Sequence, residues 1–194
     1  MSPDGPRGAL VAVVGPSGAG KDTLMSRAAA HPALHPGLRF ARRVVTRPAQ
    51  VASEDHDSLD EAGFARAEAA GAFALVWSAH GLRYGLPRAV GEDVAAGRIV
   101  VANLSRRSLA EAVAAFGTLH VVEVGARPDV LLARLSARGR EPEATIRERL
   151  ARQVAVAPPP GAASHLRLDN SGEAAAATER LVAHLNGLAV RAGV

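Results

Sequence analysis

Short apolar runs alternate with longer amphipathic stretches along most of this chain. Three runs, at 9–14, 99–103 and 119–124, are rich in valine and too short for helices, so they predict strands buried on both faces. A further strand is expected at 164–170, and helices are expected at 23–30, 109–116, 128–135, 143–156 and 173–188. Strands that alternate with helices predict an α/β fold built on a parallel, doubly wound sheet.

The segment from residue 40 to residue 97 breaks this alternation. A strand expected at 38–45 leads into a polar acidic loop at 53–58, and Asp60 then caps a helix at 60–71. Strand, turn and strand follow from 73 to 85, and a helix from 88 to 96. We therefore predict a single domain, 1–194, that consists of a core (8–39 and 98–194), an inserted substrate-binding lobe (40–97) and a lid (134–150).

A glycine-rich segment lies between the first predicted strand and the first helix: Gly15-Pro16-Ser17-Gly18-Ala19-Gly20-Lys21. In that context the pattern is a P-loop. Glycines let successive backbone N–H groups turn toward phosphate oxygens, and the helix N-terminus adds the positive end of its dipole. Lys21 supplies a mobile charge for the β- and γ-phosphates. The segment predicts that a nucleoside triphosphate binds here, in a P-loop NTPase fold.

The residue after Lys21 departs from the usual P-loop. A serine or threonine is expected there, but the chain has Asp22, and a hydroxyl arrives only at Thr23. A carboxylate beside phosphates repels them unless a cation or water lies between. We expect Asp22, with Thr23, to hold hydrated Mg²⁺ or to face the second substrate; the plainer alternative is an acid that stabilises the helix dipole.

Arginine supplies nearly all of the positive charge in a chain of net charge +4. Arginine suits bidentate recognition of phosphate. It occurs in three groups, of which the last continues onto the following helix: Arg42, Arg43 and Arg47; Arg83 beside Tyr84; and Arg134, Arg138 and Arg140, then Arg147, Arg149 and Arg152. Separate groups and an aromatic content of 3% argue against a nucleic-acid binder.

The last arginine group has two interpretations. Arg134 and Arg138 are four residues apart, so a helix would place both on one face, and Gly139 would let this segment close over the phosphates as a lid. Alternatively, these arginines lie on solvated helix faces with partners such as Glu143 and Glu148.

The acidic segment Glu54-Asp55-His56-Asp57 leaves three possibilities open: a metal cluster, a loop that recognises substrate hydroxyls, or a solvated turn. No second histidine lies at ligand spacing, which disfavours a transition-metal site. His80 ends an apolar strand and is either structural or catalytic, and Trp77 is expected in the core of the lobe.

The chain has no cysteine, no apolar run near the ~20 residues of a membrane span and no secretory signal pattern. We therefore expect a cytoplasmic protein that does not contact membranes, either a monomer or a homodimer.

Several motifs together resemble the guanylate-kinase-like branch of P-loop kinases. They are the P-loop, Thr46-Arg47-Pro48, Trp77 followed by Gly81-x-x-Tyr84-Gly85, Arg134 with Arg138-Gly139, and Asp169-Asn170. Guanylate kinases carry a base-reading acid just before the tryptophan, where this chain has Val76, and part of their acidic strand motif is replaced here by Ala102-Asn103 with Ser105-Arg106.

The chain is more similar to the ribose 1,5-bisphosphate phosphokinase family of phosphonate catabolism. The similarity lies in Lys21-Asp22-Thr23, Arg42-Arg43-x-x-Thr46-Arg47-Pro48, Glu54-Asp55-His56 and Trp77-x-Ala79-His80-Gly81-Leu82-x-Tyr84-Gly85. The resemblance implies transfer of the γ-phosphoryl group of ATP to ribose 1,5-bisphosphate, which gives 5-phosphoribosyl 1-diphosphate and ADP. A nucleoside monophosphate kinase or a kinase of the gluconate type is the alternative, and Lys21 argues against a non-enzymatic scaffold.

The resemblance also assigns expected roles. Lys21, Asp22, Arg134 and Arg138 would act in the transfer, and Asn170 would join Gly15 to Thr23 in binding ATP. The sugar bisphosphate would contact Arg42, Arg43, Thr46, Arg47, Glu54, Asp55, His56, His80, Arg83, Tyr84, Asn103 and Arg106.

Overall fold

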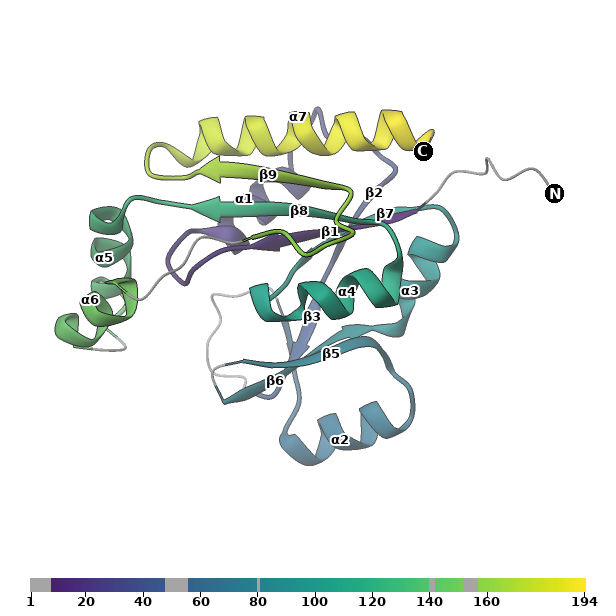
Figure 1. Ribbon diagram of the computed structural model, residues 1–194, viewed down its shortest axis with the longest axis horizontal. Coiled ribbons are helices and arrows are strands. Elements are labelled where there is room, and N and C mark those ends of the chain that lie inside the picture. The colour runs from purple at the N-terminus through teal and green to yellow at the C-terminus, as the bar shows by residue number, and fades with distance from the viewer. Residues whose placement is uncertain (1–7, 48–55, 80, 140–141, 152–156) are drawn as a thin grey trace.

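A computed structural model describes residues 8–47, 56–79, 81–139, 142–151 and 157–194 of the chain. Its strands form two sheets, one of five strands and one of four (Figure 1).

The five-stranded sheet is the core of the molecule, and all of its strands are parallel. Its order is β2-β7-β1-β8-β9, and its strands are β1 (Ala9–Val14), β2 (Leu38–Ala41), β7 (Ile99–Asn103), β8 (Leu119–Gly125) and β9 (Ser164–Asp169). Every residue of β1 is buried, as expected for a central strand covered on both faces. The parallel, doubly wound sheet predicted from the apolar runs is confirmed.

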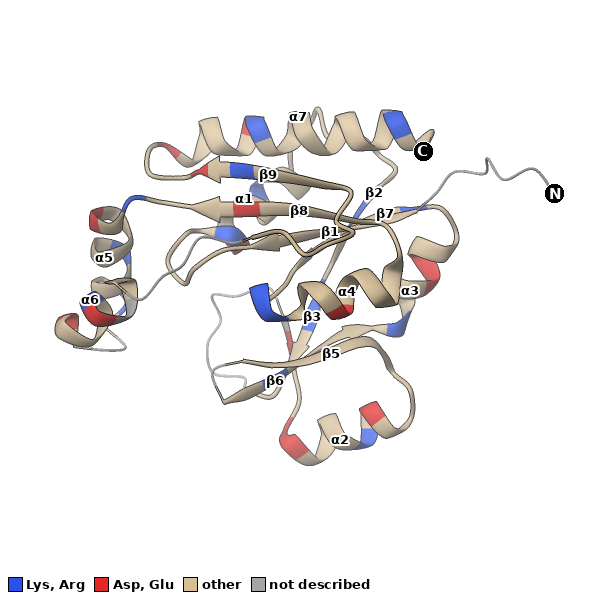
Figure 2. Cartoon of the chain, in the orientation of Figure 1, with Lys and Arg blue, Asp and Glu red and all other residues tan. Residues whose placement is uncertain are grey.

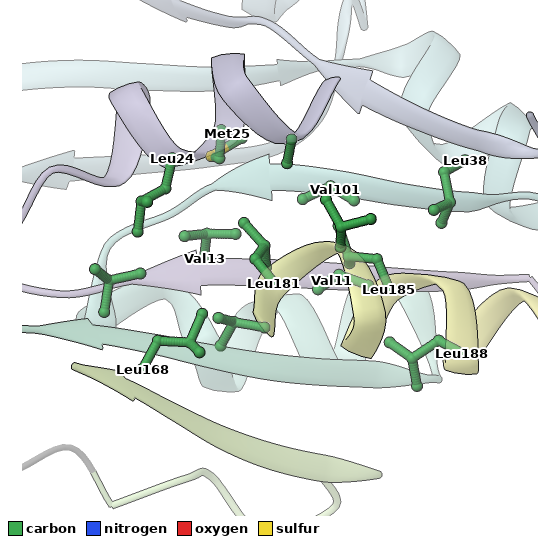
Figure 3. Close-up of a cluster of buried hydrophobic side chains, with 14 of the residues drawn as sticks. Val11, Val13, Leu24, Met25, Leu38, Val101, Leu168, Leu181, Leu185 and Leu188 are labelled. Atoms are coloured by element: carbon green, nitrogen blue, oxygen red, sulfur yellow. The ribbon is translucent and has the colours of Figure 1, made fainter. Parts of the chain in front are cut away.

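Helices cover both faces of this sheet (Figure 1). On one face α1 (Lys21–Ala29) and α7 (Ala174–Ala192) pack on Val11 and Val13, in the cluster drawn in Figure 3. On the other face α3 (Arg88–Ala95) and α4 (Leu109–Phe116) pack on Leu10 and Ala12. Three further short helices are α5 (Pro128–Ser136), α6 (Glu143–Ala151) and the 3₁₀ turn η1 (Arg106–Ser108).

The four-stranded sheet lies within the predicted lobe. Its order is β4-β3-β6-β5, and its strands are β3 (Arg43–Val45), β4 (His56–Ser58), β5 (Phe73–Ala79) and β6 (Leu82–Pro87). Only β3 and β4 run parallel. The helix α2 (Glu61–Ala69) begins at Asp60, whose carboxylate accepts a hydrogen bond from the Gly63 amide at 2.6 Å, so the predicted cap is confirmed.

Helix ends differ from the expected ones by a few residues, as where α7 continues to Ala192 beyond the expected 188, and two strand assignments differ more. The single strand expected at 38–45 is divided at Arg42 into β2 and β3, which belong to different sheets, because the chain passes there from the core into the lobe. The acidic loop expected at 53–58 ends in the short strand β4, which pairs with β3. The limits proposed for core, lobe and lid stay predictions.

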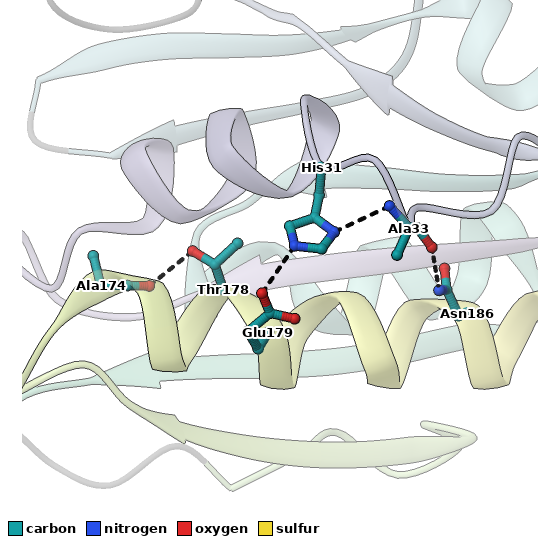
Figure 4. A network of polar contacts seen from close by, with 6 residues as sticks. All are labelled: His31, Ala33, Ala174, Thr178, Glu179 and Asn186. Carbon is teal, nitrogen blue, oxygen red and sulfur yellow. Dashed lines mark hydrogen bonds and ion pairs between the residues drawn. The ribbon is translucent and has the colours of Figure 1, made fainter.

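A polar network ties the segment after α1 to α7 (Figure 4). The His31 ring lies 2.9 Å from Glu179 and accepts a hydrogen bond from the Ala33 amide, and Asn186 donates to the Ala33 carbonyl at 2.7 Å. The carboxamide oxygen of Asn186 also accepts from the His35 amide at 2.8 Å. These bonds, with the apolar packing of Figure 3, hold α1 in a set orientation on the sheet.

Candidate active site

The P-loop follows β1 and ends at Gly20, the N-cap of α1. Gly20 has φ +88°, and a Cβ there would lie 2.5 Å from the side-chain nitrogen of Asn170, Nδ2. Both the backbone conformation and the close approach therefore require glycine. Lys21 folds back over this loop, and its ammonium donates to the carbonyls of Gly15 at 2.8 Å and Pro16 at 3.1 Å.

This arrangement fits the phosphates of ATP. The backbone N–H groups at the start of α1 have no partner within the helix, and the dipole makes the same end positive. The Lys21 ammonium lies directly beside them. The loop and lysine can therefore bind phosphate oxygens with backbone amides and one mobile cation.

The segment that follows β9 also contacts the P-loop. Asn170, at the carboxyl end of β9, is buried and donates from its carboxamide to the Ala19 carbonyl at 2.7 Å. The helix α5 packs the Leu135 side chain 3.0 Å from the position of a Cβ at Gly18. Arg134 precedes Leu135 on α5, and its Nη1 lies 3.9 Å from the position that a Cβ of Gly20 would occupy.

Two buried polar atoms near the P-loop have no hydrogen-bond partner within the part of the chain that the structure describes: Arg134 Nη1 and Asn170 Oδ1. Buried polar groups normally have partners, so this pair is suited to a bound ligand. Arg138, by contrast, is exposed and lies after Ser136, the last residue of α5. The expectation that Arg134 and Arg138 share one helical face is therefore wrong, because the helix ends between them.

A cavity of about 300 Å³ opens beside the P-loop, between α1, β2 and β7. Its polar end is formed by Asp22, Arg43 and Asn103, and the remaining lining residues are Met25, Ser26, Ala29, Ala30, Phe40 and Ala41. Asp22, Met25, Ser26 and Ala29 lie on one face of α1, at spacings of three and four residues, and Ala30 is the C-cap directly after the helix. Helical spacing counted from Asp22 is the sequence signal that predicts these additional lining residues.

Asp22 links the two sides of the polar end. It accepts a hydrogen bond from the Asn103 carboxamide nitrogen at 2.5 Å, and Arg43 Nη2 lies 4.0 Å from the same oxygen. Asn103 Oδ1 is buried and has no partner among the described residues. A buried acceptor of this kind is suited to a hydroxyl or N–H donor from a ligand.

Several other predicted site residues lie within the lobe and contact its other residues, and they do not line this cavity. Thr46 is buried and accepts from the Arg83 amide at 2.9 Å, which joins β3 to β6. Arg83 forms an ion pair with Glu68 of α2 and lies 4.6 Å over the Phe64 ring. Their positions indicate roles in holding the lobe together.

The rest of the predicted set is dispersed. Arg42 forms an ion pair with Asp57 at 3.1 Å, and Thr23 is exposed. Arg47 and Arg106 are half-buried and are not among the lining residues of the cavity. Tyr84 is buried beneath Arg43, and His56 begins β4. Glu54, Asp55 and His80 lie outside the described residues.

Among the described residues, basic positions do not follow one another alone along α2, α6 or α7 (Figure 2). Acidic and basic positions are mixed along α2, α6 and α7 (Figure 2). On α6, Arg147 pairs with Glu143 at 2.6 Å, as the solvated-face interpretation expects. Within the described ranges, no group of three or more histidine, aspartate or glutamate side chains is placed to hold a metal ion. No helix in those ranges combines the length and the apolar character that crossing a membrane requires.

Comparison with known proteins identifies close relatives. No family model matches the chain. Ribose 1,5-bisphosphate phosphokinase PhnN of Brucella melitensis is 49% identical over 193 residues, which are 98% of each chain. The protein of the same name from Methylobacterium radiotolerans is 50% identical over 178 residues, 92% of this chain and 97% of the relative.

Solved structures share the fold at low sequence identity. The guanylate kinase of Anaplasma phagocytophilum has a TM-score of 0.66 at 14% identity and covers 94% of this chain and 87% of its own. A gluconokinase of Sinorhizobium meliloti has a TM-score of 0.53 at 20% identity and covers 96% of both chains. At these identities the likeness shows the shared P-loop kinase fold and nothing further.

Proposed function

The chain belongs to the ribose 1,5-bisphosphate phosphokinase family, and on that premise we propose that it transfers the γ-phosphoryl group of ATP to ribose 1,5-bisphosphate. The products are 5-phosphoribosyl 1-diphosphate and ADP, in the degradation of phosphonates. In this step the bond between the γ-phosphorus and the β–γ bridging oxygen breaks, and a bond forms between that phosphorus and an oxygen of the phosphate on C1.

One observation carries the geometric argument: the polar end of the cavity is continuous with the P-loop through Asp22. Asp22 directly follows the phosphate-binding Lys21, and it contacts Asn103 and approaches Arg43 across the cavity. An acceptor phosphate held by Arg43 would therefore lie beside the γ-phosphate. Phosphoryl transfer depends chiefly on this positioning and on the neutralisation of charge.

The chain's own groups supply the positioning. Lys21 and the backbone amides of the P-loop hold the β- and γ-phosphates, and Arg134 reaches the same loop from α5. Asn103 offers its buried carboxamide oxygen to a ribose hydroxyl. No strong general base is required, because the acceptor is already an ionised phosphate oxygen.

We also propose that Asp22 assists in holding Mg²⁺ through water. Asp22 is half-buried, and its carboxylate faces the cavity beside the phosphate loop, where a hydrated cation would separate like charges. Mg²⁺ there would neutralise charge on the phosphates. Exposed Thr23 is the weaker candidate. A cytoplasmic location and a monomeric or homodimeric state stay predictions.

Guanylate kinase activity is the competing proposal because of the shared fold. The position before Trp77 is Val76, which pairs with Gly85 in the lobe sheet. Valine offers no hydrogen-bond acceptor to a guanine base. A site that lacks such a partner typically loses about 10⁴-fold or more in discrimination.

The experiment measures product formation from ATP and ribose 1,5-bisphosphate, with GMP as the competing acceptor. We expect turnover of the bisphosphate and little turnover of GMP; the reverse preference would refute the proposal. Lys21→Ala should lower kcat by about 10²- to 10³-fold, because the substitution removes the positive charge that stabilises the phosphoryl group during transfer. Arg27→Ala, an exposed position at the other end of α1, is the matched control.

A further inference from the structure

The tryptophan and the tyrosine of the chain are stacked under the arginine of the cavity. Trp77 on β5 and Tyr84 on β6 are cross-strand partners, and their rings lie 5.4 Å apart with an angle of 8° between their planes. The Arg43 guanidinium lies over the Tyr84 ring, with its central carbon 5.5 Å from the centre of that ring.

Strand register places these side chains on one face of the lobe sheet. Tyr84 is opposite both Trp77 and Val45, and Arg43 is two residues before Val45 on the same strand. Residues two apart on a strand share a face. The aromatic pair belongs to the buried cluster between lobe and core, so Trp77 and Tyr84 form a rigid base.

Two of the groups that contact Arg43 contribute to its orientation. Its side chain is only 15% exposed, with the Asp22 carboxylate 4.0 Å from Nη2 and the Tyr84 ring beneath the guanidinium. A planar guanidinium is attracted to the face of an aromatic ring, and the attraction strengthens as water is removed. Without the ring, this long side chain has more rotamers to lose when an acceptor phosphate binds.

We infer that Tyr84, supported by Trp77, is a positioning residue for the acceptor substrate, and that it acts through the face of its ring on Arg43. The inference rests on the proposed function, in which Arg43 holds an acceptor phosphate. It assigns Tyr84 a different role from the direct substrate contact expected from the sequence. In that direct role the phenolic hydroxyl would be the essential group.

Two substitutions at Tyr84 separate ring from hydroxyl. Tyr84→Leu removes the cation–π contact, and we expect the acceptor KM to rise about 5- to 30-fold while the KM for ATP and kcat change by less than about threefold. Tyr84→Phe keeps the ring and should restore the acceptor KM to within about threefold of wild type. An acceptor KM for Tyr84→Phe as high as that of Tyr84→Leu would overturn the inference, because the hydroxyl would then be responsible.

A double-mutant cycle tests whether Tyr84 acts through Arg43. In an Arg43→Met background, Tyr84→Leu should produce less than about a twofold further rise in acceptor KM, because the group that it positions has already been removed. Multiplicative effects of the two substitutions would show that Tyr84 acts independently of Arg43 and would contradict the inference.

A structural readout keeps this inference separate from the proposed function. If the wild type does not phosphorylate ribose 1,5-bisphosphate, the proposed function fails, and crystal structures of the two Tyr84 variants still decide the role of the ring. We expect the guanidinium of Arg43 to keep its position in Tyr84→Phe and to leave it in Tyr84→Leu. An Arg43 side chain that keeps its position in Tyr84→Leu would refute the inference. If Tyr84→Leu does not fold, a displaced Arg43 in Tyr84→Phe would refute it.

Discussion

Asp22 lies between the P-loop, which we propose binds ATP, and the polar end of the cavity, which we propose holds the acceptor. One of its carboxylate oxygens, Oδ1, accepts from Asn103 and lies 4.0 Å from Arg43, while its backbone belongs to the first turn of the helix that begins at Lys21. In this position an acid orients two neighbours and complements the helix dipole at the same time. The departure from the usual P-loop hydroxyl therefore has a structural reason in this chain.

Asn103→Asp tests that contact with a minimal change of shape. It replaces the N–H donor of Asn103 by a carboxyl oxygen at the 2.5 Å contact with Asp22, so the hydrogen bond that orients the Asp22 carboxylate toward Arg43 is lost and like charges repel. We expect kcat/KM for the acceptor to fall at least about tenfold. Steady-state kinetics at fixed ATP measures this.

The matched control is Asn186→Asp, the same chemical change on α7 in the network that ties α7 to the segment after α1. It removes the donor to the Ala33 carbonyl, so it should lower stability, and because Asn186 lies outside the cavity it should lower kcat/KM less than Asn103→Asp does. Equal losses in the two variants would argue against a specific role for Asn103.

At the scale of elements, α1 combines three tasks along its length. Its first turn presents the P-loop amides and Lys21, one of its faces lines the cavity, and the segment that follows it is tied to α7 through His31 and Asn186. A shift of this helix would therefore move the nucleotide side and the cavity wall together.

Gly20→Ala tests the tight junction between the P-loop and its neighbours. A left-handed conformation costs a non-glycine residue about 1–2 kcal/mol. The new Cβ would also lie 2.5 Å from the side-chain nitrogen of Asn170 and would disturb the hydrogen bond that this nitrogen donates to the Ala19 carbonyl. We expect lower stability in urea unfolding and a KM for ATP raised by about tenfold or more.

Gly71→Ala separates the two causes. Gly71 also has a positive φ, +69°, but nothing lies within 4 Å of its Cβ position. It should lose about 1 kcal/mol of stability and keep the wild-type KM for ATP. If Gly20→Ala behaved like this control, the close contact with Asn170 would have no functional consequence.

For the whole molecule, sequence patterns predicted the architecture better than the site. Runs such as 9–14 are buried on both faces, so their composition alone indicates central parallel strands. The division at Arg42 was missed because the strand-forming pattern continues through it, and only the change of sheet reveals it.

Whether a residue lines the cavity depends on the direction of its side chain. The spacing of residues in the sequence predicts that direction only within a single helix or strand. Helical spacing from Asp22 would have pointed to Met25 and Ser26, which were not among the predicted site residues. Arg43 and Arg83 both lie in strands of the lobe sheet, yet one faces the cavity and the other pairs with Glu68 on α2. That difference arises from strand pairing between segments about forty residues apart, which no local pattern shows.

Two histidines give the whole molecule an expected pH dependence. Burial lowers the pKa of His120 on β8 and of His184 on α7, and positive charge on Arg191 lowers both further; His184 also lowers that of His120. As pH falls below about 6.5, the unfolded chain takes up protons at these positions before the folded protein does, so folding stability decreases.

We therefore expect Tm to fall between pH 7 and pH 5, and a His120→Asn/His184→Gln double variant to show a shallower fall. Scanning calorimetry across this range makes the measurement. The same slope in wild type and double variant would assign the acid sensitivity to other groups.

The stack of Trp77 and Tyr84 also has a consequence for spectroscopy. The chain contains one tryptophan and one tyrosine, and they lie ring to ring beneath Arg43. All intrinsic ultraviolet emission from these two residue types therefore originates at the wall of the proposed acceptor site, without any label. We expect the emission of Trp77 to change when the sugar bisphosphate binds, so that stopped-flow fluorescence can follow substrate entry in the wild-type protein in real time.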